Sequence, residues 1–161
     1  MNKKIKQWML STDNSWTAFI LRLTLGLVLF PHAAQKLFGW FDGPGLQGEI
    51  AYMTSHVNLP MFLAVSAIAV ECLGTFFILL GFLTRLTSIA IFFLFIGMIV
   101  VDHAAHGFFM NWFGKMPAGA EGFEYHLLVL GICLALILQG GGRYALDKLW
   151  GSKSWNSRDQ Y

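Results

Sequence analysis

The chain has 161 residues, of which 56% are hydrophobic and 12% charged, a composition that excludes an ordinary soluble domain of this size. Its formal net charge of +2 is too small to indicate a nucleic-acid partner, and its basic residues flank apolar segments instead of forming a stripe. The two cysteines, Cys72 and Cys133, lie in different apolar runs without a CxxC spacing. We therefore expect two buried thiols rather than a disulfide framework or a thioredoxin-like dithiol.

Four apolar segments are long enough, or nearly so, to cross a bilayer as helices, which takes about 20 residues. The predicted helices cover about residues 16–38, 60–83, 86–107 and 122–140. The last two have shorter apolar cores, so tilt or bending has to cover the remainder of the hydrocarbon. The expected fold class is therefore all-α, a four-transmembrane-helix bundle that forms a single domain over residues 1–161.

Basic residues indicate which end of the bundle faces the cytoplasm. One side carries Lys3, Lys4, Lys6, Arg85, Arg143, Lys148, Lys153 and Arg158, and the other carries Lys36 and Lys115. Positive charge favours the cytoplasmic side, which places both termini, the turn at 84–87 and a tail at 141–161 in the cytoplasm. A cleaved signal peptide is the competing interpretation of the first segment, but that segment is too long for an h-region and lacks a small-residue cleavage site.

The two longer loops then face outward. In the first of them, residues 39–59, Leu46, Ile50, Met53 and Val57 recur at helical spacing. This spacing predicts a short interfacial helix lying on the membrane, with a plain surface loop as the alternative. In the second, an aromatic group is expected at the level of the lipid headgroups. It consists of Phe108, Phe109, Trp112 and Phe113.

Two charged residues lie well inside the predicted spans. Counted from the cytoplasmic ends at a rise of about 1.5 Å per residue, Arg22 lies about 9 Å deep and Glu71 about 18 Å deep. Long side chains on adjacent helices can bridge this separation, so we expect a buried ion pair between Arg22 and Glu71. The pair either pins the first two helices together or leaves Glu71 to handle a proton or a ligand.

A second group of polar residues converges about 21 to 26 Å from the inner side, or slightly farther out. Its members are His32, Lys36, Asp102, His103, His106, Glu124 and His126. Asp102 and His106 are four residues apart and His103 and His106 three apart, so these pairs share a face of the third helix. The arrangement predicts a polar pocket just below the outer membrane surface.

Several chemistries could use such a pocket. Histidines beside a carboxylate and a cation can bind quinone carbonyls and exchange protons. His32, His103 and His126 could instead ligate a metal, or one of them could hold haem. No metal fingerprint is present, because the HAAH sequence lacks the glutamate of HExxH. A hydrated rim of histidines at the interface is the remaining alternative.

Short motifs follow one another in order along about 130 residues of the chain. They are the segment from Arg22 to Gly26, Lys36-Leu37 with Gly39, Leu59-Pro60, Glu71-x-x-Gly74, Leu80-Gly81-x-x-Thr84-Arg85, and Gly140-Gly-Gly-Arg143 followed by Asp147. In this order and spacing the sequence resembles the DoxX family of small four-helix bacterial membrane proteins. Of the candidate site residues, Arg22, Lys36 and Glu71 fall on these motifs.

The resemblance implies a multi-pass protein of the bacterial inner membrane. Some members of the family resemble membrane subunits of redox systems, including quinone-linked sulfur-compound oxidation and defence against oxidative stress. The leading hypothesis is therefore a quinone-interacting or redox-partner membrane subunit, as in a quinone-linked oxidoreductase. A non-catalytic anchor or assembly factor for soluble partners is the first alternative, and transport of a small solute or ion by an oligomer is the second. The expected partners are the lipid bilayer, a quinone, and a soluble redox partner or a second copy of the chain.

Overall fold

The computed structural model describes residues 3–117 and 120–151, and these residues form helices and loops without a β-strand. The helices are α1 (Lys3–Leu10), α2 (Trp16–Phe38), α3 (Gly45–Ser55), α4 (Met61–Leu80), α5 (Thr84–Val101), the short 3₁₀ helix η1 (His103–His106), α6 (Glu124–Gln139) and α7 (Asp147–Gly151). The all-α prediction is confirmed. The predicted tail is described as far as residue 151, and Lys153 and Arg158 lie outside the described residues.

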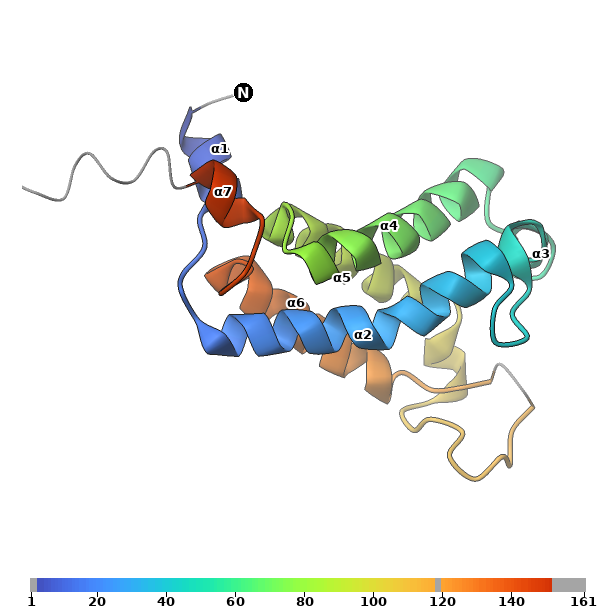
Figure 1. Ribbon diagram of the computed structural model, residues 1–161. Helices are drawn as coiled ribbons and strands as arrows, with labels where there is room; N and C mark the ends of the chain where they lie inside the picture. The colour runs from blue at the N-terminus through green and yellow to red at the C-terminus, as the bar shows by residue number, and fades with distance from the viewer. Residues whose placement is uncertain (1–2, 118–119, 152–161) are drawn as a thin grey trace, which may run out of the picture.

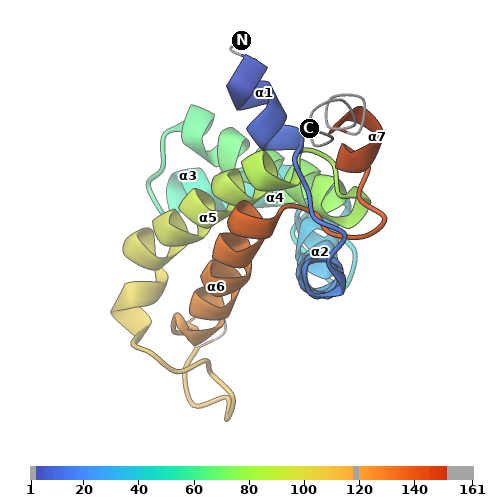
Figure 2. The same ribbon diagram turned by 90° about the vertical axis from the view of Figure 1, so that its left-hand side faces the viewer.

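Four helices form the bundle. Helix α2 packs on α4, α4 on α5, α5 on α6, and α6 returns to contact α2. Figure 1 shows α1 and α7 together at the end of the bundle where α2 begins, and α3 at the other end. In the view turned by 90°, the long loop between η1 and α6 extends away from the end that carries α1 and α7 (Figure 2).

Helix length decides which of these helices can cross a membrane. Helices α2, α4 and α5 have 23, 20 and 18 residues and are apolar enough to cross one, whereas the apolar helix α6 has 16 residues. At about 1.5 Å per residue, α6 is roughly 24 Å long, slightly short of a typical hydrocarbon core of about 30 Å. The structure therefore agrees with a bundle of about four membrane helices, of which the last is the shortest.

The third predicted helix is too long. It was expected to continue to residue 107, but α5 ends at Val101 because Asp102 leaves the helical conformation with φ −133°. The chain then tightens into η1, which carries His103 and His106. The fourth predicted helix begins two residues later than expected, at Glu124. Both differences lie at the end of the bundle that carries the predicted pocket.

Helix α2 is defined at both ends by its own sequence. The Ser15 side chain accepts a hydrogen bond from the Ala18 N–H at 3.2 Å, and Gly39 ends the helix in a left-handed conformation with φ 71°. Pro31 lies inside α2 and removes one helical N–H donor. Figure 1 shows the second half of α2 turning away from the line of its first half, as expected for a proline kink. The kinked half carries His32 and Lys36.

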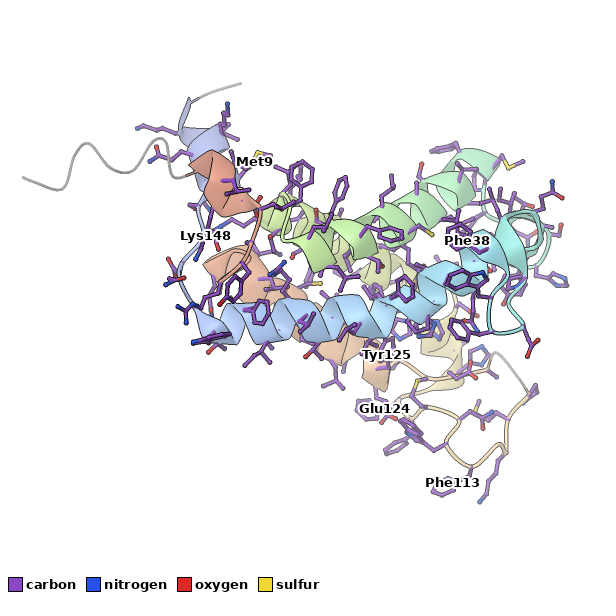
Figure 3. All side chains as sticks on the ribbon, viewed as in Figure 1. Met9, Phe38, Phe113, Glu124, Tyr125 and Lys148 are labelled. Carbon is purple, nitrogen blue, oxygen red and sulfur yellow. The ribbon has the colours of Figure 1, made fainter. Side chains whose placement is uncertain are left out.

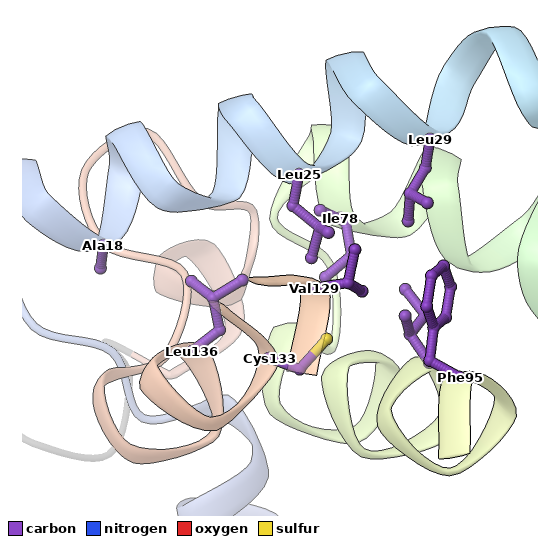
Figure 4. Close-up of a cluster of buried hydrophobic side chains, with 9 residues drawn as sticks. Ala18, Leu25, Leu29, Ile78, Phe95, Val129, Cys133 and Leu136 are labelled. Carbon is purple, nitrogen blue, oxygen red and sulfur yellow. The ribbon is translucent and has the colours of Figure 1, made fainter. Parts of the chain in front are cut away.

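The core lies between the four long helices. Nine buried side chains form it: Ala18, Leu25, Leu29, Ile78, Ile91, Phe95, Val129, Cys133 and Leu136. Figure 4 shows the side chains of α2 pointing toward those of α5 and α6. A second, smaller cluster of Ala33, Ile68 and Cys72 lies nearer to α3. Both cysteines are buried free thiols, as predicted.

The outward faces of the long helices are also apolar. Large side chains on these faces are more than half exposed: Ile20 and Leu27 on α2, Leu73 on α4, Phe93 on α5, and Leu128 and Leu138 on α6. In water this would be an unusually large apolar surface, whereas in a bilayer it faces lipid tails. The same pattern on all four bundle helices supports a membrane environment.

Helix α3 confirms the helix expected in the first outer loop. It packs against both α2 and α4. Ile50 and Met53 contact the smaller core cluster, which fixes α3 over the end of the bundle. This contact also brings Glu49, which is 8% exposed, next to α2.

Gly81 lies so close to neighbouring atoms that a larger residue there should lower the stability of the protein. Gly81 ends α4 with φ +66°, and a Cβ there would meet Arg22 Nη1 and lie 2.7 Å from the Ala145 Cα. We expect Gly81→Ala to lower the free energy of unfolding by roughly 2 kcal/mol, through left-handed strain and overpacking. Gly97 is the matched control, because a Cβ there meets nothing within 4 Å. Gly97→Ala should stabilise α5 by about 0.5–1 kcal/mol, as measured by denaturant unfolding in mixed micelles. Equal effects of the two substitutions would contradict this packing.

Candidate functional site: a histidine pocket and a polar cluster at opposite ends of the bundle

Arg22 is buried at the end of the bundle where α2 begins, with 2% of its surface exposed. Its Nη1 donates to the carbonyl oxygens of Leu79 at 2.8 Å and Ile78 at 3.3 Å, and its Nη2 donates to that of Arg143 at 3.1 Å. The last carbonyls of a helix have no partner within the helix, so the guanidinium satisfies the end of α4.

The predicted ion pair between Arg22 and Glu71 is therefore wrong. Glu71 lies seven residues before Ile78 on α4, about two helical turns or roughly 10 Å away along the axis. Its carboxylate pairs with Lys36 instead, with Oε2 2.6 Å from Nζ. Depth counting placed both residues in the bundle interior but did not resolve which of the two cations Glu71 meets.

Asp147 completes the polar cluster around Arg22. It is 1% exposed, and its two carboxylate oxygens accept the N–H groups of Leu83 at 2.6 Å and Thr84 at 2.9 Å. Leu83 is the N-cap residue of α5 and Thr84 its first residue, so Asp147 caps that helix from the segment after α6. Burial raises the pKa of the Asp147 carboxyl, while the N–H donors and the charge of Arg22 partly oppose this shift.

Most of the motif residues that carry the family resemblance meet at this end. Arg85 donates to the carbonyl oxygens of Ser11 at 3.1 Å and Ile137 at 2.9 Å, and so joins α5 to α6 and to the segment before α2. Together with Arg22, Gly81, Arg143 and Asp147 it forms what we call the end cluster. The hydrogen bonds of the end cluster go to backbone groups, which gives it a structural role.

At the other end of α2, Lys36 lies between two carboxylates. Its Nζ is 2.6 Å from Glu71 Oε2 and 3.6 Å from Glu49 Oε1. The side chains of Glu71 and Glu49 are only 3% and 10% exposed, and that of Lys36 is 19% exposed. One cation thus faces two carboxylates in a largely dry environment, and the group carries a formal excess of one negative charge when all three are ionised.

A pocket of about 380 Å³ opens beside this group. We call it the histidine pocket. Its lining comprises His32, Lys36, Glu71, His103, Glu121, Tyr125 and His126 as polar residues, and Leu29, Phe95, Met98 and Met110 as apolar ones. The structure thus brings together four of the seven residues predicted to form the pocket, namely His32, Lys36, His103 and His126, and adds Glu71 to them.

The histidine rings are closely arranged. The centroids of the His103 and His126 rings are 4.1 Å apart, and the Phe95 ring lies 5.3 Å from that of His126. His103 Nδ1 is 2.7 Å from the Glu121 carbonyl oxygen, which can only accept, so Nδ1 carries the proton and donates. Nε2 of a neutral His103 then remains as an acceptor.

Two buried polar atoms of the pocket residues lack a partner within the described part of the chain. They are Nδ1 of His126, a residue that is 4% exposed, and the hydroxyl of Tyr125. The Tyr125 ring lies 6.2 Å from the ring of His32 on α2. Buried polar groups are almost always hydrogen-bonded, so two unpartnered atoms on adjacent residues that both line one pocket are typical of a site that receives a ligand or water.

The other three predicted residues lie outside the pocket lining. Asp102 Oδ1 contacts His106 Nε2 at 3.5 Å, four residues along the chain. Glu124 accepts hydrogen bonds from the Met110 N–H at 3.1 Å and from the Trp112 indole N–H. Figure 3 shows Glu124 on the side of the bundle where the loop between η1 and α6, with Phe113, projects. Glu124 therefore fixes the loop.

Sequence reasoning missed Glu49, Tyr125 and the carbonyl of Glu121. Glu49 had a usable signal, since it lies three residues after Leu46 and four before Met53 and so shares the apolar face of the predicted helix. Tyr125 stands between Glu124 and His126, which the sequence did single out. Which residue of α2 its ring meets depends on how α6 packs against α2, and this packing cannot be read from the sequence. No sequence pattern identifies the Glu121 carbonyl, because its role depends on how the loop folds.

The metal alternative finds no support in the geometry. Within residues 3–117 and 120–151, no group of three or more His, Cys, Asp or Glu side chains is arranged to hold a metal ion. His103 and His126 lie ring against ring, and the Nδ1 proton of His103 is already donated. Polar donors among aromatic and methionine side chains fit an organic ligand better.

Comparisons with known proteins agree with the membrane bundle. The family model named DoxX matches residues 17–104, which span α2 to α5 and the start of η1. The chain is 31% identical over 129 residues to "Putative oxidoreductase CatD" of Bacillus subtilis, covering 80% of this chain and 82% of that protein. It is 29% identical over 113 residues to "Inner membrane protein YphA" of Escherichia coli, covering 70% and 79% respectively. No solved structure matches the chain. With more than half of its length matched by the family model, the chain belongs to the DoxX family.

Proposed function

We propose that this protein binds a quinone in the histidine pocket and serves as a quinone-interacting membrane subunit of a redox system. The observation that carries the proposal is the pair of unpartnered polar atoms, the Tyr125 hydroxyl and His126 Nδ1, in residues that line one pocket. A quinone presents two carbonyl oxygens on a flat apolar ring. Hydrogen-bond donors at the edge of an aromatic pocket are the groups that recognise it.

The size and walls of the pocket suit such a ring. Its volume of about 380 Å³ falls in the range of roughly 300–1,000 Å³ that is usual for small-molecule sites. Phe95 offers an aromatic face, and Leu29 and Met98 offer apolar contact. The pocket opens within the membrane bundle, where an apolar ligand can arrive from the bilayer.

Ionisable groups in and beside the pocket could supply protons to a bound quinone as it is reduced. Full reduction adds two electrons and two protons to the ring. The imidazole nitrogens of His103 and His126 are groups that can exchange protons, and Glu71 lies in the same pocket as the partner of Lys36. Glu49 provides Lys36 with a second carboxylate, so Lys36 keeps an anionic partner if Glu71 takes up a proton.

Two further features support the cellular setting. The printed names of the relatives, "Putative oxidoreductase CatD" and "Inner membrane protein YphA", agree with a redox role in the inner membrane. The basic residues near both termini favour a cytoplasmic location for α1 and α7. In this orientation the histidine pocket lies toward the outer face, and the loop with Phe108 and Trp112 projects outward beside it.

Tyr125→Phe tests the proposal with the smallest change of shape. We expect it to weaken the binding of a short-chain quinone about tenfold, because one hydrogen bond of roughly 1–1.5 kcal/mol is lost while the ring remains. Tyr52→Phe is the matched control, since Tyr52 lies on α3 outside the pocket and is 45% exposed. Affinity is measured by equilibrium dialysis of detergent-solubilised protein, with the quinone read by its ultraviolet absorbance. Absence of saturable binding by the unmodified protein, or equal affinities of the two variants, would contradict the proposal.

A further inference from the structure

A second cavity, of about 420 Å³, lies at the end of the bundle opposite the histidine pocket. It is formed between the segment before α2 and the segment that leads into α7, and its lining includes Asn14, Arg143, Tyr144, Lys148 and Leu149. Figure 3 shows Lys148 at this end and Phe38, the last residue of α2, at the other. The cavity is therefore separate from the proposed quinone site.

Two cations meet in this cavity, and no carboxylate among residues 3–117 and 120–151 is paired with them. Arg143 stacks on the Trp16 ring, with Cζ 4.5 Å from the ring centroid, and Lys148 Nζ is 2.5 Å from Asn14 Oδ1. In the described ranges, neither residue has an acidic side chain within ion-pair distance. Burial and the neighbouring charge of Arg143 lower the pKa of Lys148, which indicates mutual repulsion. The nearby carboxylate of Asp147 is used to cap α5.

The surroundings of these cations are apolar and exposed. Trp16, Tyr144 and Leu149 are 51%, 71% and 66% exposed. The rings of Trp16, Phe19 and Tyr144 pack edge to face, with centroids 5.6 to 6.1 Å apart. Trp16 begins the first membrane-spanning helix, and aromatic side chains at such positions lie at the level of the lipid headgroups. The cavity thus combines positive charge at headgroup depth with apolar surface next to it.

We propose that this cavity binds the phosphate group of an anionic phospholipid. Arg143 and Lys148 contact the phosphate oxygens, Asn14 donates a further hydrogen bond through its amide, and the acyl chains lie along Trp16 and Tyr144. Basic pockets between membrane helices bind lipid headgroups in this way, with the guanidinium forming paired hydrogen bonds. A soluble phosphate compound could bind the same two cations, but it would leave the exposed apolar surface beside them in contact with water.

The experiment uses the full chain in neutral detergent and measures lipid adducts by native mass spectrometry. Phosphatidylglycerol, phosphatidylcholine and inorganic phosphate are added in separate titrations. We expect phosphatidylglycerol to bind in preference to phosphatidylcholine. Lys148→Gln should weaken this binding about fivefold, and Arg143→Gln/Lys148→Gln about thirtyfold, because each cation near a headgroup contributes to binding.

The matched control is Lys6→Gln/Lys115→Gln, which removes two exposed lysines outside the cavity. This control should retain the affinity of the unmodified protein. If the double cavity variant unfolds, Lys148→Gln alone carries the test. Within the described residues, the Lys148 side chain forms one hydrogen bond, to the side chain of Asn14, so its loss should disturb the fold little. Equal phosphatidylglycerol affinity in the cavity and control variants would overturn the proposal. Inorganic phosphate binding as tightly as phosphatidylglycerol would also overturn it, since the site would then belong to a soluble anion.

Discussion

Lys36→Met is expected to lower the free energy of unfolding by about 3–5 kcal/mol, the usual cost of removing one partner from a buried ion pair. The substitution leaves Glu71 and Glu49 facing each other with no cation between them. Both carboxylates are almost completely buried, so neither water nor salt can screen their repulsion well. Unfolding in mixed micelles, followed by circular dichroism, measures the change.

The effect should be asymmetric between the partners. Glu71→Gln leaves Lys36 with Glu49 at 3.6 Å and with an amide oxygen in place of the carboxylate, so we expect a loss of about 1–2 kcal/mol. Lys115→Met, at an exposed lysine, should change the free energy of unfolding by less than about 0.5 kcal/mol. If Glu71→Gln cost more than Lys36→Met, the view of Lys36 as a shared cation between two carboxylates would be wrong.

Asp147→Ala is the second substitution with a large expected effect, a loss of roughly 3 kcal/mol in the free energy of unfolding. It removes the acceptors of the Leu83 and Thr84 N–H groups, and an unsatisfied buried donor costs about 1–3 kcal/mol. It also removes a negative charge that acts favourably on the buried guanidinium of Arg22. The same unfolding measurement applies.

Two variants make this prediction specific. Asp147→Asn keeps one carbonyl oxygen as an acceptor and should cost about half as much as Asp147→Ala. Asp42→Asn is the matched control, because Asp42 is exposed in a loop with φ 60°, a conformation that asparagine tolerates. Quinone affinity should be unchanged in Asp147→Asn, because the end cluster lies away from the histidine pocket. A loss of quinone binding without a loss of stability would contradict the structural role of Asp147.

The family motifs thus divide into two groups. Arg22, Gly81, Arg85, Arg143 and Asp147 close one end of the bundle through backbone hydrogen bonds and close packing. Lys36 and Glu71 lie at the other end and line the histidine pocket. The sequence already separated Arg85 and Arg143 from Lys36 by their side of the membrane, but it assigned Glu71 to Arg22, and only the structure shows that Glu71 belongs with Lys36.

Several features of the fold followed from local chemistry. The long apolar runs predicted the helices because a run of about 20 such residues satisfies its own backbone and faces lipid. The spacing of Leu46, Ile50 and Met53 predicted α3, and burial of the two thiols followed from the runs that contain them. Helix ends were less predictable. Asp102 ends α5 through a backbone conformation that no residue pattern in that segment specifies.

The sequence by itself determined the all-α membrane bundle and the convergence of His32, Lys36, His103 and His126 at one depth, since both depend on distances along a helix. Only the tertiary structure decided which partner each charge meets. The rotation of α2 and its packing against α3 and α4 place Lys36 beside Glu71 and Glu49. They also place Arg22 within hydrogen-bond distance of the last carbonyl oxygens of α4. Distance along an axis follows from residue number, whereas the direction of a side chain around that axis is set by the helices that pack against it.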